Sequence, residues 1–195
     1  MFTNTRKCGL CAAASIVALS GAANADELLL IDLSVADQIT VTATAGLSAV
    51  DASGSNFTGF LLGDFYAGAG GALGSTLVSG DLTSANNPSD GSPSLFRDGG
   101  GSDTGLNIWS FSSDSNVSFT AGAVAFVGSA TWSLDSDDYA DMVAGNATGD
   151  IHFAADDSGD IPGAMVLGTY RVVPSPAALS LLGLGLGMGA TRRRR

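Results

Sequence analysis

The stretch that decides the fold is Gln38-Ile-Thr-Val-Thr-Ala-Thr-Ala45, in which apolar and polar side chains alternate with a period of two residues. In an extended strand this spacing places Ile39, Val41 and Ala43 on one face and the threonines on the other. The apolar run Glu27-Leu-Leu-Leu-Ile-Asp-Leu33 comes shortly before it. The two segments predict consecutive β-strands with one face against a core.

Further strand-sized segments follow, separated by clusters of Gly, Ser, Asn and Asp. They are residues 57–65, 72–79, 106–112, 116–120, 123–128, 131–134, 150–154 and 165–173. This pattern predicts an all-β fold, an antiparallel β-sandwich or jelly roll. No long amphipathic helix interrupts the strands, which disfavours an α/β fold with a parallel sheet.

One short helix is expected between Trp132 and Ile151. Ser136 is a capping residue, and the acids that follow it oppose the positive end of the helix dipole. Tyr139, Met142 and Val143 share one face of this helix, and Gly145 is expected to end it.

Charge divides the chain into three parts. Residues 26–173 contain all nineteen acidic residues, and with Arg97 and Arg171 as their only cations they carry a net charge of −17. Because affinity for polyanions comes largely from Lys and Arg that neutralise phosphate, this body excludes nucleic-acid binding. The other basic residues lie in residues 1–25 and 174–195.

Residues 1–25 are typical of a secretory signal peptide. A cationic start at Arg6 and Lys7 precedes an apolar stretch, and Ala23 and Ala25 give the A-x-A spacing that signal peptidase cleaves. We therefore expect a signal helix that is removed before Asp26. Both cysteines, Cys8 and Cys11, lie in this segment, so the mature chain is expected to contain no thiol and no disulfide.

Residues 174–195 combine three features. Pro174-Ser175-Pro176 precedes an apolar segment of Ala, Leu and Gly that runs to Ala190, and a basic cluster follows at Arg192, Arg193, Arg194 and Arg195. As a helix, the fourteen apolar residues reach about 21 Å, and snorkelling arginines bring the segment closer to the roughly 30 Å of a bilayer core. The positive-inside rule keeps the arginines in the cytoplasm and the acidic body outside.

This order of Pro-x-Pro, short Leu/Gly-rich helix and arginine cluster resembles the PEP-CTERM sorting signal of bacterial exosortase substrates. The resemblance covers about residues 173–195 and implies that a membrane-embedded, exosortase-like transpeptidase processes the chain at or near Pro174-Ser175-Pro176. Ser175 stands where the commonest form of the signal has Glu. A small residue between the prolines resembles the variant of planctomycete-like surface proteins.

Catalytic constellations are not evident in the sequence. His152 is the one histidine, and it sits in a strand pattern that points it away from Ile151 and Phe153, without a G-x-S-x-G elbow. Zinc lacks its usual ligand set, because one His and no Cys remain in the body. A glycosidase pair would have to be chosen among eighteen aspartates, and nothing selects one. We expect no enzymatic activity and no obligatory cofactor.

Calcium is the metal that suits the remaining chemistry, because it takes carboxylate and carbonyl oxygens from flexible loops. Three acidic stretches offer such ligands; the alternative for each is a solvated acidic loop. The candidate ligands are Asp98 and Asp103; Asp135, Asp137, Asp138 and Asp141; and Asp156, Asp157 and Asp160.

Aromatic side chains raise a second binding hypothesis. Trp109 or Trp132 could stack against a sugar ring, and Phe111 falls on the same strand face as Trp109. A sandwich, however, needs most of its aromatics in the core.

These observations predict an exported, non-enzymatic protein of the cell surface or extracellular matrix. Its partners are expected to be signal peptidase and the exosortase-like enzyme during export, the membrane through the C-terminal helix, and an extracellular polysaccharide. The alternative is a calcium-dependent carbohydrate-binding module anchored at the surface.

Overall fold

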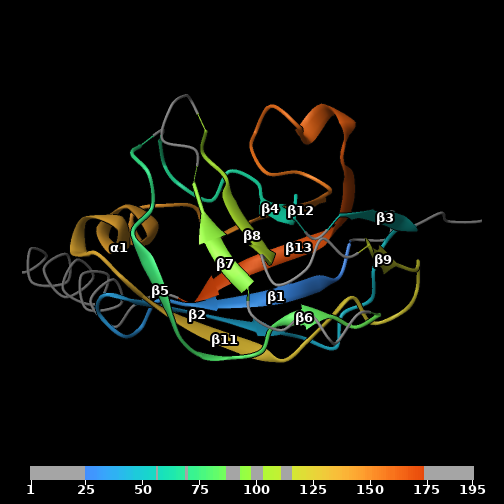
Figure 1. Cartoon of the computed structure of the whole chain (residues 1–195), viewed down its shortest axis with the longest axis horizontal. Helices are drawn as coiled ribbons and strands as arrows, with labels where there is room; N and C mark the ends of the chain where they lie inside the picture. Colours follow the sequence, from blue (N-terminus) through green and yellow to red (C-terminus); the bar gives the residue numbers. More distant parts are fainter. Residues whose placement is uncertain are drawn as a thin grey trace, which may run out of the picture.

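The computed structural model describes residues 25–55, 57–68, 70–86, 93–97, 103–110 and 116–173 (Figure 1). The signal helix expected in residues 1–24 and the apolar helix expected in residues 174–195 lie outside the described residues. Within the described ranges, no helix has both the length and the apolar character needed to cross a bilayer.

The described chain is built mainly of strands, which confirms the all-β class. The strands are β1 (Glu27–Asp32), β2 (Gln38–Ala43), β3 (Ala52–Ser55), β4 (Phe60–Leu62), β5 (Ser75–Gly80), β6 (Thr83–Ser84), β7 (Pro93–Phe96), β8 (Leu106–Ser110), β9 (Asn116–Phe119), β10 (Phe126–Val127), β11 (Ser129–Leu134), β12 (Thr148–Phe153) and β13 (Met165–Val173). Two helices complete the described part, α1 (Ser136–Val143) and the 3-10 helix η1 (Ile161–Gly163).

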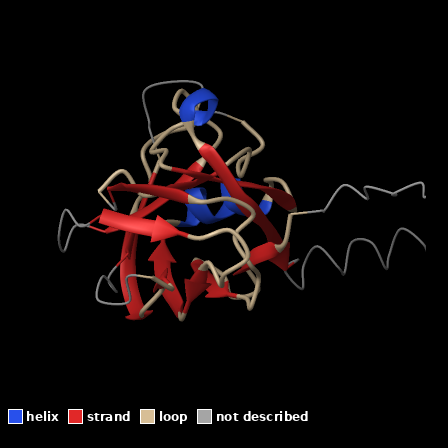
Figure 2. Cartoon of the chain, turned by 90° about the vertical axis from the view of Figure 1, so that its right-hand side faces the viewer, coloured by secondary structure: helices blue, strands red, loops and turns tan. Residues whose placement is uncertain are grey.

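Nine of these strands form one sheet in the order β5-β11-β2-β1-β13-β12-β4-β8-β7. The sheet curls so far that its two edge strands, β5 and β7, contact each other. In Figure 2 the strands accordingly lie around the sides of the molecule, with η1 standing at the top. The core is therefore enclosed between opposed parts of one sheet.

The sequence pattern predicts a purely antiparallel sheet, and this prediction is wrong for one pair of strands. β1 pairs in parallel with β13, the last described strand, and antiparallel with β2. This parallel pair joins segments more than a hundred residues apart, a relationship that local hydrophobic periodicity does not contain. Two small sheets, β3 with β9 and β6 with β10, lie beside the large one.

The inner face of the sheet carries the core, and the period-two prediction for residues 38–45 is confirmed. Ile39 and Val41 are fully buried, opposite Trp132 and Ala130 of β11. On the other face, the Thr40 hydroxyl lies 2.8 Å from that of Thr131. One strand thus separates a dry core from a polar ladder, as alternation in a half-buried strand requires.

Helix α1 covers one end of the sheet but does not begin as predicted. Its N-cap is Asp135 rather than Ser136, and no side chain makes a capping hydrogen bond there. Met142 is buried and the Tyr139 hydroxyl donates to the Leu33 carbonyl at 2.7 Å, which fixes the helix on the sheet. Val143, expected on the same face, is exposed because the helix ends at that residue.

The chain between β12 and β13 folds back over part of the outer face of the sheet. Leu61 and Ala155 are completely buried there, although they lie outside the main core. Asn107 is also buried and donates to the carbonyls of Thr58 and Ala155, each at 2.9 Å. We call residues 154–164 the covering segment, because Ala155 and Ser158 contact the outer side through Asn107 and Asp103.

Candidate functional sites

The sorting motif and most of the signal lie where no geometry can be given. Ala23, Pro174, Ser175, Pro176 and Arg192, Arg193, Arg194 and Arg195 are outside the described residues. Ala25 is the first described residue and lies two residues before the start of β1. At the other end, Val173 is the last residue of β13 and pairs with Asp32.

The third acidic stretch forms a compact group on the covering segment. One carboxylate oxygen from each of Asp156, Asp157 and Asp160 lies within 4.8 Å of the others, and among the described residues this is the one such set of three. Partial burial, a hydrogen bond with Asp160 and the charges of Asp160 and Asp157 raise the pKa of Asp156. The charges of Asp160 and Asp157 raise this pKa because carboxylates repel one another when all are ionised.

Asp103 joins the same segment from a distant part of the sequence. It is buried, and its Oδ1 accepts hydrogen bonds from the Gly105 amide at 2.9 Å and the Ser158 amide at 3.2 Å. The Ser158 hydroxyl donates to the same oxygen, whereas Oδ2 has no hydrogen-bond partner among the described residues. Asp103 therefore fastens the covering segment to the start of β8, and Asp98, its expected companion, is outside the described residues.

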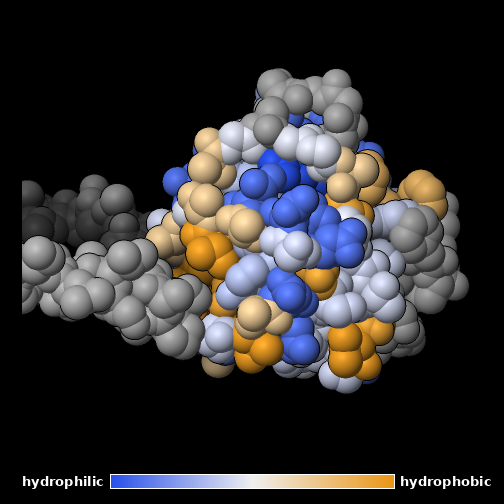
Figure 3. All heavy atoms as spheres, turned by 90° about the vertical axis from the view of Figure 1, so that its left-hand side faces the viewer, coloured by the Kyte–Doolittle hydropathy of each residue, from blue (hydrophilic) through white to orange (hydrophobic). Residues whose placement is uncertain are grey.

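The acids around α1 have separate contacts. Asp138 accepts the Gly74 amide at 2.8 Å, and Asp141 pairs with Arg97 at 3.1 Å. Asp135 is the N-cap residue of α1, without a side-chain capping hydrogen bond, and Asp137 lies exposed in the first turn. On the side of the molecule that carries α1, strongly hydrophilic residues gather at the centre of the surface (Figure 3). Asp138 and Asp141 thus bind groups of neighbouring segments, Gly74 and Arg97.

Arg97 is a buried cation, and its burial was not predicted from the sequence. Its guanidinium carbon lies 3.5 Å from the centre of the Tyr66 ring, and Nη2 donates to the Gly68 carbonyl at 2.6 Å. Burial raises the pKa of Tyr66, and the Arg97 charge opposes that rise. A cavity of about 100 Å³, lined partly by Tyr66 and Asp141, lies beside this group. A desolvated cation over an aromatic face stabilises the loop that holds it.

The second cation of the acidic body, Arg171, also forms an ion pair. Arg171 donates from Nε to Glu27 Oε2 at 2.7 Å and from Nη2 to Glu27 Oε1 at 3.2 Å. The Glu27 contact raises the pKa of Arg171. This bidentate pair bridges the parallel strands β1 and β13.

His152 points away from the core, as predicted, but it is not on an open strand face. It pairs with Leu61 across β12 and β4, lies beneath the outer surface and is 9% exposed. Among the described residues its Nδ1 has no hydrogen-bond partner, so none of their carboxylates orients the ring through that atom. The orienting contact of a triad is therefore missing at this nitrogen.

The two tryptophans differ in their surroundings. Trp132 is buried in the core and its indole nitrogen donates to the Pro93 carbonyl at 3.1 Å, so the hypothesis that it stacks on a sugar is wrong. Trp109 is half-buried on β8 and meets Phe57 edge to face, with ring centres 5.2 Å apart. Phe111 is outside the described residues.

Comparison with family models, with curated proteins and with solved structures found no match to this chain.

Proposed function

We propose that the chain is an exported, non-enzymatic surface or matrix protein, sorted through a PEP-CTERM-like signal that an exosortase-like transpeptidase processes. The observation that carries the proposal is the tripartite segment Pro174-Ser175-Pro176, apolar run and arginine cluster, together with a signal peptide at residues 1–25. A single transmembrane segment and flanking arginines would hold the body outside the cytoplasmic membrane until processing.

The body is compatible with life outside the cell. It contains no cysteine, so folding there would not require disulfide formation. Its large negative charge opposes self-association in solution through mutual repulsion. His152, the one imidazole, lies beneath the surface, and none of the described residues is a hydrogen-bond partner of its Nδ1, which supports a non-enzymatic role.

Mass spectrometry of the chain isolated from its native cells tests the sorting proposal. We expect a mature N-terminus at Asp26 and loss of the arginine cluster. Pro174→Ala with Pro176→Ala should leave the C-terminal segment attached, whereas Pro162→Ala, a proline of η1, should not. A mature, membrane-bound wild-type chain that still ends in Arg195 would overturn the exosortase step without affecting the signal peptide.

The alternative function is a calcium-dependent carbohydrate-binding module. A specific observation favours its carbohydrate part, namely the pair of rings formed by Phe57 and Trp109 at the surface. The calcium part stays a prediction.

A further inference from the structure

Three aromatic side chains share the part of the outer sheet face that the covering segment leaves open. In the β7–β8 pair, Leu95 faces Ile108 and both are buried in the core. Because side chains alternate along a strand, Phe96 and Trp109 project from the opposite face. They occupy diagonal positions on neighbouring strands, within the reach of large side chains.

Phe57 completes the group from the turn before β4. Its amide donates to the Ser55 hydroxyl at 3.0 Å, and its ring stands at 82° to that of Trp109. Gly59, with φ of 75°, lets this turn approach closely, since a Cβ there would lie 2.5 Å from the Trp109 Cβ. The turn therefore fixes Phe57 against Trp109 before any ligand arrives.

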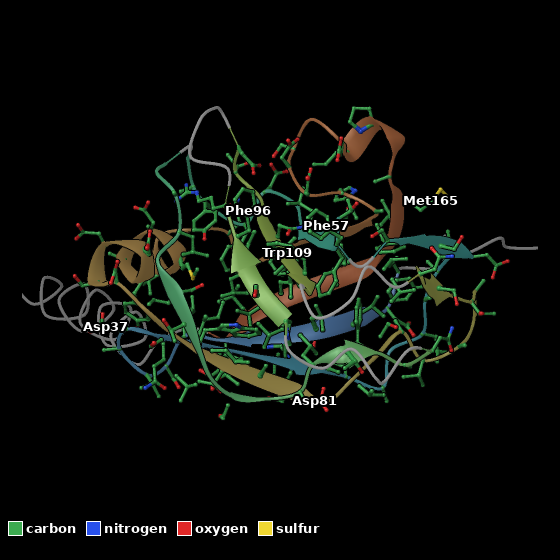
Figure 4. The ribbon with its side chains drawn as sticks, in the orientation of Figure 1. Asp37, Phe57, Asp81, Phe96, Trp109 and Met165 are labelled. Atoms are coloured by element: carbon green, nitrogen blue, oxygen red, sulfur yellow. The ribbon has the colours of Figure 1, made fainter. Side chains whose placement is uncertain are left out.

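The surface of this group is apolar and open. Phe57 is 57% exposed and Phe96 is 41% exposed, while Trp109 is half-buried. Figure 4 shows the three side chains in the region of β7 and β8, apart from Met165 at the start of β13. Clustered exposed aromatics of this kind mark binding surfaces in soluble proteins.

Charge decides which partner suits the surface. The body carries −17, and both of its cations are already engaged, Arg97 in the interior and Arg171 with Glu27. An acidic polymer would meet repulsion with no cation of the body left to offset it. A neutral sugar, by contrast, presents C–H groups that the negative face of an aromatic ring attracts. Ser94, directly opposite Trp109, adds a hydroxyl beside the rings.

We propose that Phe57, Phe96 and Trp109 form a stacking surface for a neutral polysaccharide. The biological setting rests on the proposed export, since the polymer would be met outside the cell. Binding itself is measured with purified protein, so its failure and the failure of the sorting proposal are distinguishable.

The first experiment uses the full-length chain in a mild detergent without a sugar headgroup. Calorimetry at millimolar ligand compares neutral hexasaccharides, namely β-1,4-glucan, β-1,3-glucan, mannan and xylan fragments, with acidic hexasaccharides of alginate and hyaluronan. We expect saturable binding of at least one neutral probe and none of the acidic ones. Absence of binding to every neutral probe, or tighter binding of an acidic one, overturns the proposal.

Variants locate the surface. Phe57→Ala and Phe96→Ala change exposed side chains and should each weaken binding about tenfold or more, as loss of a central aromatic contact does. Met165→Ala, an exposed apolar residue on another strand, should leave the affinity unchanged. Equal affinities of all three variants and the wild type would place any sugar site elsewhere.

Tryptophan fluorescence supplies a readout that needs no mutation. The chain contains two tryptophans, and Trp132 is 1% exposed, so an uncharged quencher such as acrylamide reaches mainly Trp109. The bound glycan should reduce quenching, and Phe57→Ala should abolish this protection. Sedimentation at the same concentrations tests the other occupant: a second copy that buries the surface would appear as a dimer that Phe57→Ala dissociates, and this result would also overturn the proposal.

Discussion

Trp132 and Trp109 lie on opposite faces of one sheet and have opposite surroundings. Trp132 is enclosed because the sheet curls until its edge strands meet, and its indole nitrogen finds a backbone carbonyl. Trp109 is on the outer face, of which the covering segment shields only a part, around Asn107. The inner face is therefore closed by the sheet itself, whereas the outer face is shielded from solvent only where one loop-rich segment covers it.

The largest effect is expected at the inner face. Trp132→Ala should lower the free energy of unfolding by about 3–5 kcal/mol, because it leaves a cavity in the core and orphans the Pro93 carbonyl. Trp109→Ala should lower it by less than half as much, since part of that side chain is already exposed to solvent. Urea denaturation of the full-length variants measures both values. Equal losses would contradict the division into a closed and an open face.

A smaller effect is expected under the covering segment. Asn107→Ala removes the donor to the Thr58 and Ala155 carbonyls and should cost about 1–3 kcal/mol, the penalty for leaving buried polar groups unpaired. Hydrogen exchange should also become faster in residues 154–164. Asn116→Ala, an exposed asparagine of β9, is the matched control and should change neither quantity. Unchanged exchange in Asn107→Ala would show that other contacts hold the segment.

At the open surface the effect on stability should be small. Phe57→Ala loses one edge-to-face pair, for which we expect about 0.5–1 kcal/mol. Met165→Ala should lie within about 0.5 kcal/mol of the wild type, as is usual for exposed positions. Thermal unfolding checks both variants. A loss at Phe57 as large as that at Trp132 would mean that this ring belongs to the core and is unavailable to a ligand.

The strand pattern predicted the inner face well because it is a local property. Alternation around Ile39 and Val41 fixes which side chains enter the core, and these two residues do so. The parallel pairing of β1 with β13 and the approach of β5 to β7 are contacts between distant segments, so no window of sequence contains them. Strand β7 was not predicted, because its short segment is defined by its pairing with β8.

The sequence predicted which residue types could form a site, but it did not predict which distant residues lie together. The three aspartates of residues 156–160 were recognised and do lie together, but the link to Asp103 through Ser158 spans 55 residues and gave no signal. His152 was expected on an exposed strand face, because the strand pattern around it does not predict that the covering segment lies over it. Phe57 and Trp109 are 52 residues apart and meet only through the pairing of β4 with β8.

The smallest effect expected lies in the covering segment itself. Asp156 has a raised pKa in the folded state, above its usual value of 3.8, because of partial burial and the neighbouring Asp160 and Asp157. The folded chain therefore holds this proton more tightly than the unfolded chain, so the contribution of Asp156 to stability falls as the pH rises through that window. Asp156→Asn should raise the melting temperature slightly at neutral pH and leave it unchanged below the usual pKa.

Asp81→Asn, an exposed aspartate between β5 and β6, is the control and should show no such pH dependence. Measured with a chelator, a lower melting temperature of Asp156→Asn at neutral pH would contradict the repulsion argument. A decrease confined to added Ca²⁺ would instead mean that the carboxylate serves a cation there, because binding to the folded state alone stabilises it.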